Sequence, residues 1–190
     1  QEPQRTYYST ITRADRLIGE VLAALDELGV ADNTLIIFTS DNGPENSQPN
    51  PGNKLYYSVG STGGLRGRKR SLYLGGVDVP FIVRWPGHVP AGRVDKTSVL
   101  SGVDMLPTLC AAAGVALPQD YHGDGVNVLP AFCGQPFLRA QPMFWEWREA
   151  RARDPKDWPM HAMRDGDWAF VVNEVAGRAE LFNVVSDRNQ

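Results

Sequence analysis

One run of the sequence constrains the fold more than any other: residues 34–39, TLIIFT, combine β-branched, aliphatic and aromatic side chains without a charge. This composition is typical of a β-strand that is covered on both faces. The preceding residues 9–28 carry apolar side chains at intervals of three and four, which predicts an amphipathic helix, and Gly29 suits the left-handed position that ends a helix. Helix, short turn and buried strand together predict one unit of an α/β sheet.

The middle of the chain alternates between expected elements and long connections. Residues 43–64 are rich in Gly, Pro, Asn and Ser and lack periodicity, which predicts a long loop of a kind that is often functional. A second apolar run at 79–85 predicts another strand, and residues 101–114 predict a helix with Pro107 in its first turn. We expect the Pro- and Gly-rich residues 117–142 to form a surface connection.

The last part of the chain has a different character. Short aromatic-rich runs follow residue 142, and two strand-like pieces flank a turn at Ala176 and Gly177, which predicts a small antiparallel sheet. We therefore divide the chain into residues 1–142, a portion of an α/β core, and residues 143–190, a small antiparallel β subdomain.

Composition and charge argue against several classes of function. No stretch approaches the roughly 18 uninterrupted apolar residues of a membrane helix, so no transmembrane segment is expected. The formal charge of -3 gives no long-range attraction to nucleic acid or anionic lipid, and we expect no nucleic-acid partner. Cys110 and Cys133 lack a metal-type spacing, and Cys110 is interpreted as an inert thiol on a helix.

Two oxygen-bearing side chains, Asp41 and Asn42, follow directly on the run at 34–39. Ligands of open α/β sheets collect beyond the carboxyl ends of the strands. A carboxylate and an amide carbonyl are hard donors that suit Ca²⁺ or Mg²⁺, and Gly43 allows a sharp turn around an ion. Two donors cannot satisfy a cation that takes six or more oxygens, and a plain polar turn explains the same residues.

A second candidate site is the basic loop, residues 60–76, in which glycines bracket four cations: Arg66, Arg68, Lys69 and Arg70. Glycine permits close backbone approach, and Arg and Lys can face the oxygens of an anionic ester. The pattern therefore favours a phosphate or sulfate binder. A solvated basic loop is the competing interpretation, and the run is too short and too poor in aromatic residues for a nucleic-acid surface.

The three histidines and one acid near a predicted helix start give weaker signals. His88 and His122 are expected in surface loops, and Asp104 is expected to cap the helix at 101–114 or to complement its dipole. His161 is a further candidate for substrate binding, because it belongs to a group that could rim a sugar pocket. The other members of that group are Trp145, Glu146, Trp147 and Trp158. Packing inside the small sheet is the alternative role.

Taken in order, these segments resemble the carboxy-terminal part of a type I sulfatase, within the alkaline phosphatase superfamily. The resemblance is carried by ALDELGVADNTLIIFTSDNG, STGGLRGRKRSLYLGGVDVPFIVRWPG, VDMLPTLCAAAG, DGVNVLP, MRDGDW and ELFNVVSD. No single motif decides the assignment, but their order and spacing extend over nearly the whole chain.

The resemblance implies an alkaline-phosphatase-like α/β/α sandwich followed by a small antiparallel subdomain. It implies that Asp41 and Asn42 hold a divalent cation, generally calcium, and that Lys69 is a catalytic residue contacting the sulfate ester oxygens. Arg66 is a further candidate, either for substrate binding or for positioning Lys69. The implied substrate is a sulfate ester, with sulfated carbohydrate as the class. The implied location is periplasmic, extracellular or lysosomal.

Two departures from the family pattern stand out. Leu74 and Asp78 occupy positions where relatives often have Glu and Arg, which concerns the architecture of the loop. The family's C/S-x-P-S-R motif, whose first residue matures to a formylglycine nucleophile, is absent: Cys110 begins CAAAG and Cys133 begins CGQPF. We therefore expect the nucleophile in a missing amino-terminal part of the same protein, and little or no turnover from these residues alone.

Two other functions stay open on sequence grounds. One is a phosphate or phosphonate ester hydrolase of the same superfamily, which commonly uses two transition metals and more histidines than the three found here. The other is a degenerate relative that binds sulfated glycans without cleaving them. The state of the nucleophile motif separates the enzyme from the binder.

Overall fold

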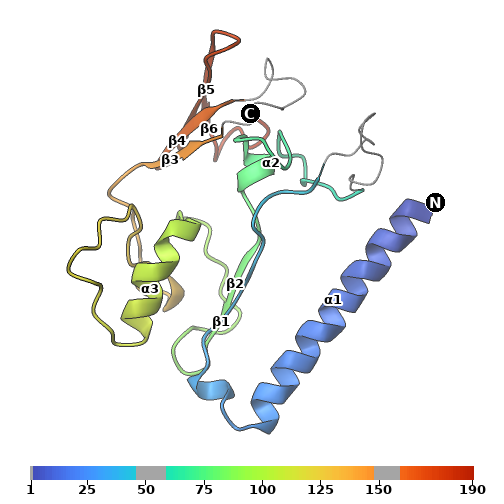
Figure 1. Ribbon diagram of the computed structural model, residues 1–190, viewed down its shortest axis with the longest axis vertical. Coiled ribbons are helices and arrows are strands. Elements are labelled where there is room, and N and C mark those ends of the chain that lie inside the picture. Colours follow the sequence, from blue (N-terminus) through green and yellow to red (C-terminus); the bar gives the residue numbers. More distant parts are fainter. Residues whose placement is uncertain (1, 46–58, 148–158) are drawn as a thin grey trace.

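The computed structural model describes residues 2–45, 59–147 and 159–190 (Figure 1). Helices and two strands make up the first three quarters of the chain, and the last quarter is a sheet. The elements are α1 (Glu2–Glu27), η1 (Ala31–Asn33), β1 (Ile36–Thr39), α2 (Leu74–Val77), β2 (Phe81–Arg84), η2 (Gly102–Asp104), α3 (Met105–Ala112), α4 (Leu129–Phe132), β3 (Met143–Glu146), β4 (His161–Asp165), β5 (Trp168–Asn173) and β6 (Arg178–Asn183).

The long amino-terminal helix α1 confirms the predicted amphipathic helix but begins earlier than the pattern at 9–28 suggests. It ends at Glu27, and Gly29 takes the expected left-handed position just beyond this end, with a φ of 67°. Its apolar stripe is not covered within the described residues: Ile11 is 48% exposed and Val21 61%. Figure 1 shows the reason, because α1 runs along one side of the molecule, apart from the C-terminal sheet. No helix in the described ranges is long and apolar enough to cross a membrane.

The strands at 34–39 and 79–85 are confirmed in place, as β1 and β2, which pair antiparallel. The prediction that the first strand is covered on both faces is wrong for the described chain: Phe38 is 47% exposed and Ile82 on β2 is 59% exposed. The two strands form a sheet of their own, and Phe38 and Ile82, which are paired across it, mark its exposed face. On the inner face, the rings of Phe81 and Phe132 lie 5.7 Å apart.

The helix predicted at 101–114 is confirmed as η2 followed by α3, with Pro107 in the first turn of α3. Asp104 takes part in a capping box with Ser101, as expected of a residue at this helix start. It is also fully buried and forms an ion pair with Arg139, whose side chain is 7% exposed. This second role, which joins η2 to the segment before β3, was not predicted.

The segment 117–142 is more than a surface connection, which corrects the prediction. It contains α4, and Val128, Ala131 and Phe132 are almost completely buried. The backbone N–H of Val128 donates to Oγ1 of Thr108 on α3 at 2.9 Å. A helix of one turn with a proline at its start shows no periodicity, so the pattern gives no sign of it.

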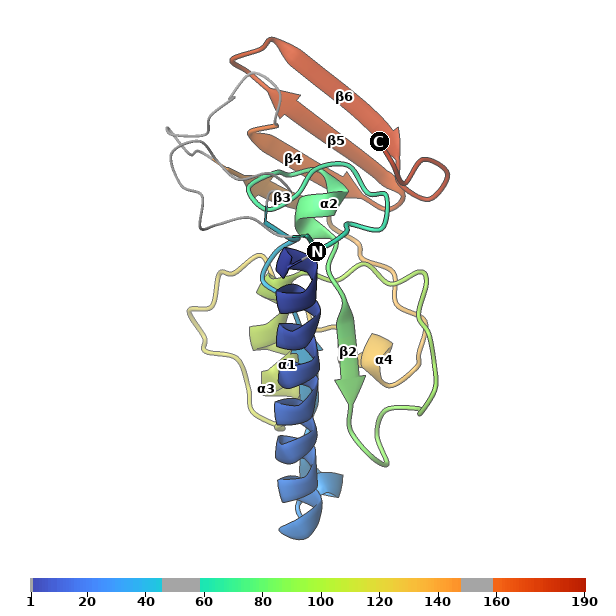
Figure 2. The same ribbon diagram turned by 90° about the vertical axis from the view of Figure 1, so that its right-hand side faces the viewer.

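The predicted small antiparallel sheet is confirmed as the meander β3-β4-β5-β6 (Figure 2). The turn between β5 and β6 includes Gly177, at a φ of 61°, where the turn was expected. Met143 begins the first strand, and we retain the division of the chain after residue 142 as a proposal.

The basic loop packs against one face of this sheet. Leu72 and Tyr73 contact Ala162 and Val171, and Leu74 lies with Ala169 and Val184 in a second cluster. Figure 2 shows α2 directly beside the strands. The sheet is therefore the support on which the basic loop is built.

Candidate functional site

The tip of β1 carries Asp41 and Asn42 on a turn that is ordered by its own hydrogen bonds. Oγ of Ser40 donates to the carbonyl of Asn42 at 2.9 Å, and Nδ2 of Asn42 donates to the carbonyl of Gly43 at 2.9 Å. The amide nitrogen of Asn42 is thus engaged, while its amide oxygen and the Asp41 carboxylate make no hydrogen bond or ion pair to any described residue. Both side chains keep oxygens available for a ligand.

Glycines bring this turn and the basic loop into direct backbone contact. The N–H of Gly43 donates to the carbonyl of Gly76 at 2.9 Å. A Cβ on Gly43 would lie 1.8 Å from the carbonyl oxygen of Gly75, and a Cβ on Gly75 would lie 2.3 Å from that of Gly67. Only residues without a side chain fit this packing, so these glycines set the distance between the two candidate segments.

The cations of the basic loop have different partners. Nε of Arg68 donates to the carbonyl of Glu45 at 2.9 Å, and Arg70 forms an ion pair with the Glu45 carboxylate. The backbone N–H of Lys69 donates to the carbonyl of Pro44 at 3.0 Å. Among the described residues, the Lys69 ammonium has no hydrogen-bond or ion-pair partner. Sequence reasoning missed Glu45, since a lone acid in a loop carries no pattern.

One hollow of about 860 Å³ lies between the tip of β1, the basic loop and the start of η2. Its lining includes Asp41, Asn42, Lys69, Arg70, Trp145 and Trp147. The structure thus brings together the predicted metal pair, the predicted lysine, and Trp145 and Trp147 from the group that was expected to rim a sugar pocket with His161. Trp158, another member of that group, falls outside the described residues.

Two further candidates lie elsewhere, because neither Arg66 nor His161 lines this hollow. His161 is on β4, where its Nδ1 lies 3.3 Å from Oε1 of Glu174 and its Nε2 lies 3.9 Å from Oε1 of Glu146. His88 stacks on Trp85, with ring centroids 3.9 Å apart. The contacts of His161 with Glu174 and Glu146, and of His88 with Trp85, agree with structural roles for both histidines.

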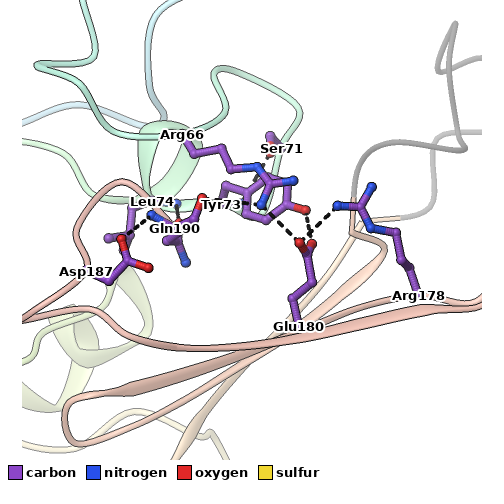
Figure 3. Close-up of polar contacts among 8 residues, drawn as sticks. All are labelled: Arg66, Ser71, Tyr73, Leu74, Arg178, Glu180, Asp187 and Gln190. Atoms are coloured by element: carbon purple, nitrogen blue, oxygen red, sulfur yellow. Dashed lines mark hydrogen bonds and ion pairs between the residues drawn. The ribbon is translucent and has the colours of Figure 1, made fainter.

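Arg66 belongs to a polar cluster between the basic loop and β6 (Figure 3). Its Nη1 lies 3.1 Å from Oε1 of Glu180, and its guanidinium carbon lies 3.9 Å from the ring centroid of Tyr73. The Tyr73 hydroxyl donates to Glu180. Burial, followed by the hydrogen bond to Glu180, raises the pKa of Tyr73 from 10.0 to about 12. Arg66 therefore contacts the sheet, which agrees with a positioning role.

Leu74 and Asp78, which depart from the family pattern, both contact the C-terminal sheet or the residues that follow it. Leu74 is 7% exposed and packs against Ala169 and Val184, where an apolar side chain is needed. The Asp78 carboxylate lies 3.0 Å from Nη2 of Arg188. Neither substitution removes a group from the tip of β1.

The donor set at the tip of β1 meets only part of the needs of a divalent cation. Within the described ranges no three His, Cys, Asp or Glu side chains gather into a metal site. Asp41 and Asn42 are hard oxygen donors at the edge of an open hollow, and they fit part of the coordination shell of calcium. Cys110 and Cys133 are free thiols and are not among the residues that line the hollow.

Two family profiles match this sequence. The profile described as Sulfatase covers residues 2–115, and the profile described as N-sulphoglucosamine sulphohydrolase, C-terminal, covers residues 67–176. The chain belongs to the sulfatase family. The match to the first profile extends over more than half of the 190 residues and includes Asp41, Asn42 and Lys69.

Curated relatives agree with this sulfatase assignment. Steryl-sulfatase from Rattus norvegicus is 39% identical over 129 residues, which are 67% of this chain and 22% of the relative. N-acetylgalactosamine-6-sulfatase from Canis lupus familiaris is 36% identical over 140 residues, 73% of this chain and 25% of the relative. Arylsulfatase A from Homo sapiens is 35% identical over 136 residues, 72% of this chain and 25% of the relative. The chain spans about a quarter of these relatives or less.

Solved structures extend the likeness to the whole chain. Ps i-CgsB in complex with k-i-k-neocarrahexaose is 30% identical, with a TM-score of 0.77 over 98% of this chain and 38% of that chain. The PsFucS1 sulfatase from Pseudoalteromonas sp. is 28% identical, with a TM-score of 0.65 over 95% of this chain and 36% of that chain. The phosphonate monoester hydrolase SpPMH from Silicibacter pomeroyi, at 22% identity and a TM-score of 0.57 over 92% of this chain and 33% of that chain, shares the fold. The α/β fold with a small C-terminal β subdomain is thereby confirmed.

Proposed function

We propose that the intact protein hydrolyses sulfate esters, and that the sulfate group is bound in the hollow between β1 and the basic loop. The observation that carries the proposal is the meeting of Asp41, Asn42 and Lys69 in one hollow, although they come from segments separated by a long connection. A carboxylate, an amide oxygen and an ammonium that has no partner among the described residues are the groups needed to hold a hard cation and to face an anionic ester.

Each of these residues has a separate part in the proposed chemistry. Asp41 and Asn42 would hold a divalent cation, calcium by family resemblance, which supplies fixed positive charge beside the ester. Lys69 donates hydrogen bonds to the ester oxygens and offsets the negative charge that grows on them as the S–O bond breaks. The nucleophile, a formylglycine by resemblance, would come from an amino-terminal part of the sulfatase fold. By the same resemblance we propose that the protein acts outside the cytosol.

The metal and lysine roles are tested with Asp41→Ala and Lys69→Ala in the intact protein. We expect Asp41→Ala to weaken calcium binding measured by calorimetry, and to lower turnover of an aryl sulfate. Lys69→Ala is expected to lower kcat/KM by on the order of 10²-fold or more, the usual cost of a lost transition-state contact. Lys96→Ala and Asp120→Ala, exposed residues away from the hollow, are matched controls.

The outcomes separate the open alternatives. Wild-type kinetics in both variants would remove the two residues from the site and refute the proposal. An intact protein that binds sulfated glycans but never releases sulfate would be a binding relative. Turnover of phosphonate or phosphate esters in preference to sulfate esters would identify a different hydrolase on the same fold.

Sulfated carbohydrate is the proposed substrate class. Trp145 and Trp147 line the same hollow as Lys69, and indole rings present large apolar faces on which sugar rings stack. Trp147→Ala, which changes the more exposed of the two rings, is expected to lower kcat/KM for a sulfated oligosaccharide about tenfold, while hydrolysis of a small aryl sulfate changes little. Trp168→Ala, an exposed tryptophan on β5, is the control. Equal losses on both substrates would argue against sugar stacking.

A further inference from the structure

One carboxylate on the C-terminal sheet holds three groups at once. Glu180, on β6, accepts a hydrogen bond from Nη1 of Arg66 at 3.1 Å and from Nη2 of Arg178 at 2.9 Å, and a third from the Tyr73 hydroxyl (Figure 3). Two of the donors, Arg66 and Tyr73, belong to the basic loop. Burial alone would raise the pKa of Glu180, but these donors outweigh it and the pKa is lowered. The charged form is therefore the one that the cluster holds.

Tyr73 joins this polar cluster to the apolar face of the sheet. Its side chain is 3% exposed, packs against Ala162 and Val171, and meets the ring of Phe182 edge-on at 6.4 Å. The guanidinium of Arg66 lies over the Tyr73 ring, 3.9 Å from its centroid. The hydroxyl is thus directed at Glu180 from a residue that cannot move without opening the packing between loop and sheet.

The part of the basic loop between Arg66 and Tyr73, its two contacts with the sheet, is tightly closed. The N–H of Gly75 donates to the carbonyl of Arg66 at 2.7 Å, and the N–H of Ser71 donates to that of Arg68 at 2.9 Å. A Cβ on Gly67 would lie 2.6 Å from Oγ of Ser71, so the turn has no spare room. Lys69 lies between Arg66 and Tyr73 in the chain, and its backbone N–H donates to the carbonyl of Pro44. A shift at Arg66 and Tyr73 is therefore passed on to Lys69.

We propose that Glu180 is a positioning residue for Lys69: it ties the basic loop to the last strand and so fixes the ammonium in the hollow. This inference rests on the proposed function, because it takes Lys69 to contact the sulfate ester. It assigns the C-terminal sheet a part in the reaction although Glu180 itself does not line the hollow. A residue that acts through another is expected to show energetic coupling to it.

The test is a double-mutant cycle in the intact protein, with Glu180→Ala, Lys69→Ala and the double variant. With Lys69 present, Glu180→Ala is expected to lower kcat/KM for an aryl sulfate by about tenfold or more, mainly through kcat. In the Lys69→Ala background the same change is expected to cost less than about twofold. Asp165→Ala, an exposed carboxylate on β4 with no described contact to the loop, is the matched control.

The cycle separates this inference from the function on which it rests. Wild-type kinetics for Lys69→Ala would refute the proposed role of the lysine. A large effect of Lys69→Ala combined with equal, additive costs of Glu180→Ala in both backgrounds would overturn the positioning role alone. If Glu180→Ala does not fold, Tyr73→Phe replaces it in the cycle, because it removes only the hydroxyl that donates to Glu180. Glu180→Gln keeps a hydrogen-bond acceptor and is expected to have a kcat/KM between those of Glu180→Ala and the wild type.

Discussion

The closest backbone approach beside the hollow is at Gly43, and it allows a quantitative prediction for Gly43→Ala. The added Cβ would lie 1.8 Å from the carbonyl oxygen of Gly75, whereas real Cβ atoms essentially never come within 3.0 Å of such an atom. The two segments must therefore separate by at least the difference, 3.0 - 1.8 = 1.2 Å. The next contact, the carbonyl carbon of Gly75 at 2.9 Å, is also backbone, so no side-chain rotation relieves the overlap.

This displacement acts directly on the candidate site. Asp41 and Asn42 precede Gly43, and the opposite segment is the basic loop that carries Lys69. A misplacement of about 1 Å can cost on the order of 10²-fold in rate, so we expect kcat/KM for an aryl sulfate to fall by at least that factor. Overpacking is expected to lower the free energy of unfolding by about 1 to 3 kcal/mol, measured by urea titration.

The control is Gly19→Ala, which makes the same chemical change on α1, where an added Cβ meets nothing within 4 Å. It is expected to leave kcat/KM unchanged and to stabilise the helix by roughly 1 kcal/mol. Wild-type kcat/KM in folded Gly43→Ala would show that the distance between the β1 tip and the basic loop does not govern the reaction. That result would refute the argument from glycine packing.

Two further predictions concern stability. Asp104→Ala leaves the Arg139 guanidinium buried without the carboxylate that pairs with it. We expect the free energy of unfolding, measured by urea titration, to fall by about 3 to 5 kcal/mol and to be partly recovered by adding Arg139→Met. Equal or greater destabilisation in the double variant would contradict this. Because the pKa of Tyr73 is raised from 10.0 to about 12, the contribution of the protonated Tyr73 to stability is complete below pH 10 and is lost as the pH rises through 12. Tyr73→Phe is expected to remove the last step of the tyrosinate absorbance titration. An unchanged titration would refute the assignment.

The sequence predicted the elements that repeat a pattern over several residues. The long helix α1, the strands β1 and β2, and the C-terminal meander each carry apolar residues at regular intervals or in a continuous run over enough positions to give a signal. The meeting of Asp41 with Lys69 was expected from the family resemblance and not from the residues alone, and the glycines of both segments permit the close approach.

Burial and short elements were less accessible from the sequence. The exposure of Phe38 depends on which elements cover β1, and this is a property of the surrounding fold and not of TLIIFT itself. α4 is a single turn, and its buried residue Val128 is recognised only through its contact with Thr108. Glu180 carries no local pattern either, since its role depends on a loop more than a hundred residues earlier in the chain.

The charges that line the hollow bear on how an anionic ester can enter it. The charged side chains in the lining are Asp41, Asp78, Lys69 and Arg70, two of each sign. Arg188 offsets Asp78 and Glu45 offsets Arg70, so the carboxylate of Asp41 and the ammonium of Lys69 are the pair without a described partner. Without further charge, a sulfate ester would meet as much repulsion from Asp41 as attraction from Lys69. A divalent cation on Asp41 and Asn42 would reverse the sign at that end, which is why the proposed function requires the metal pair and the lysine together.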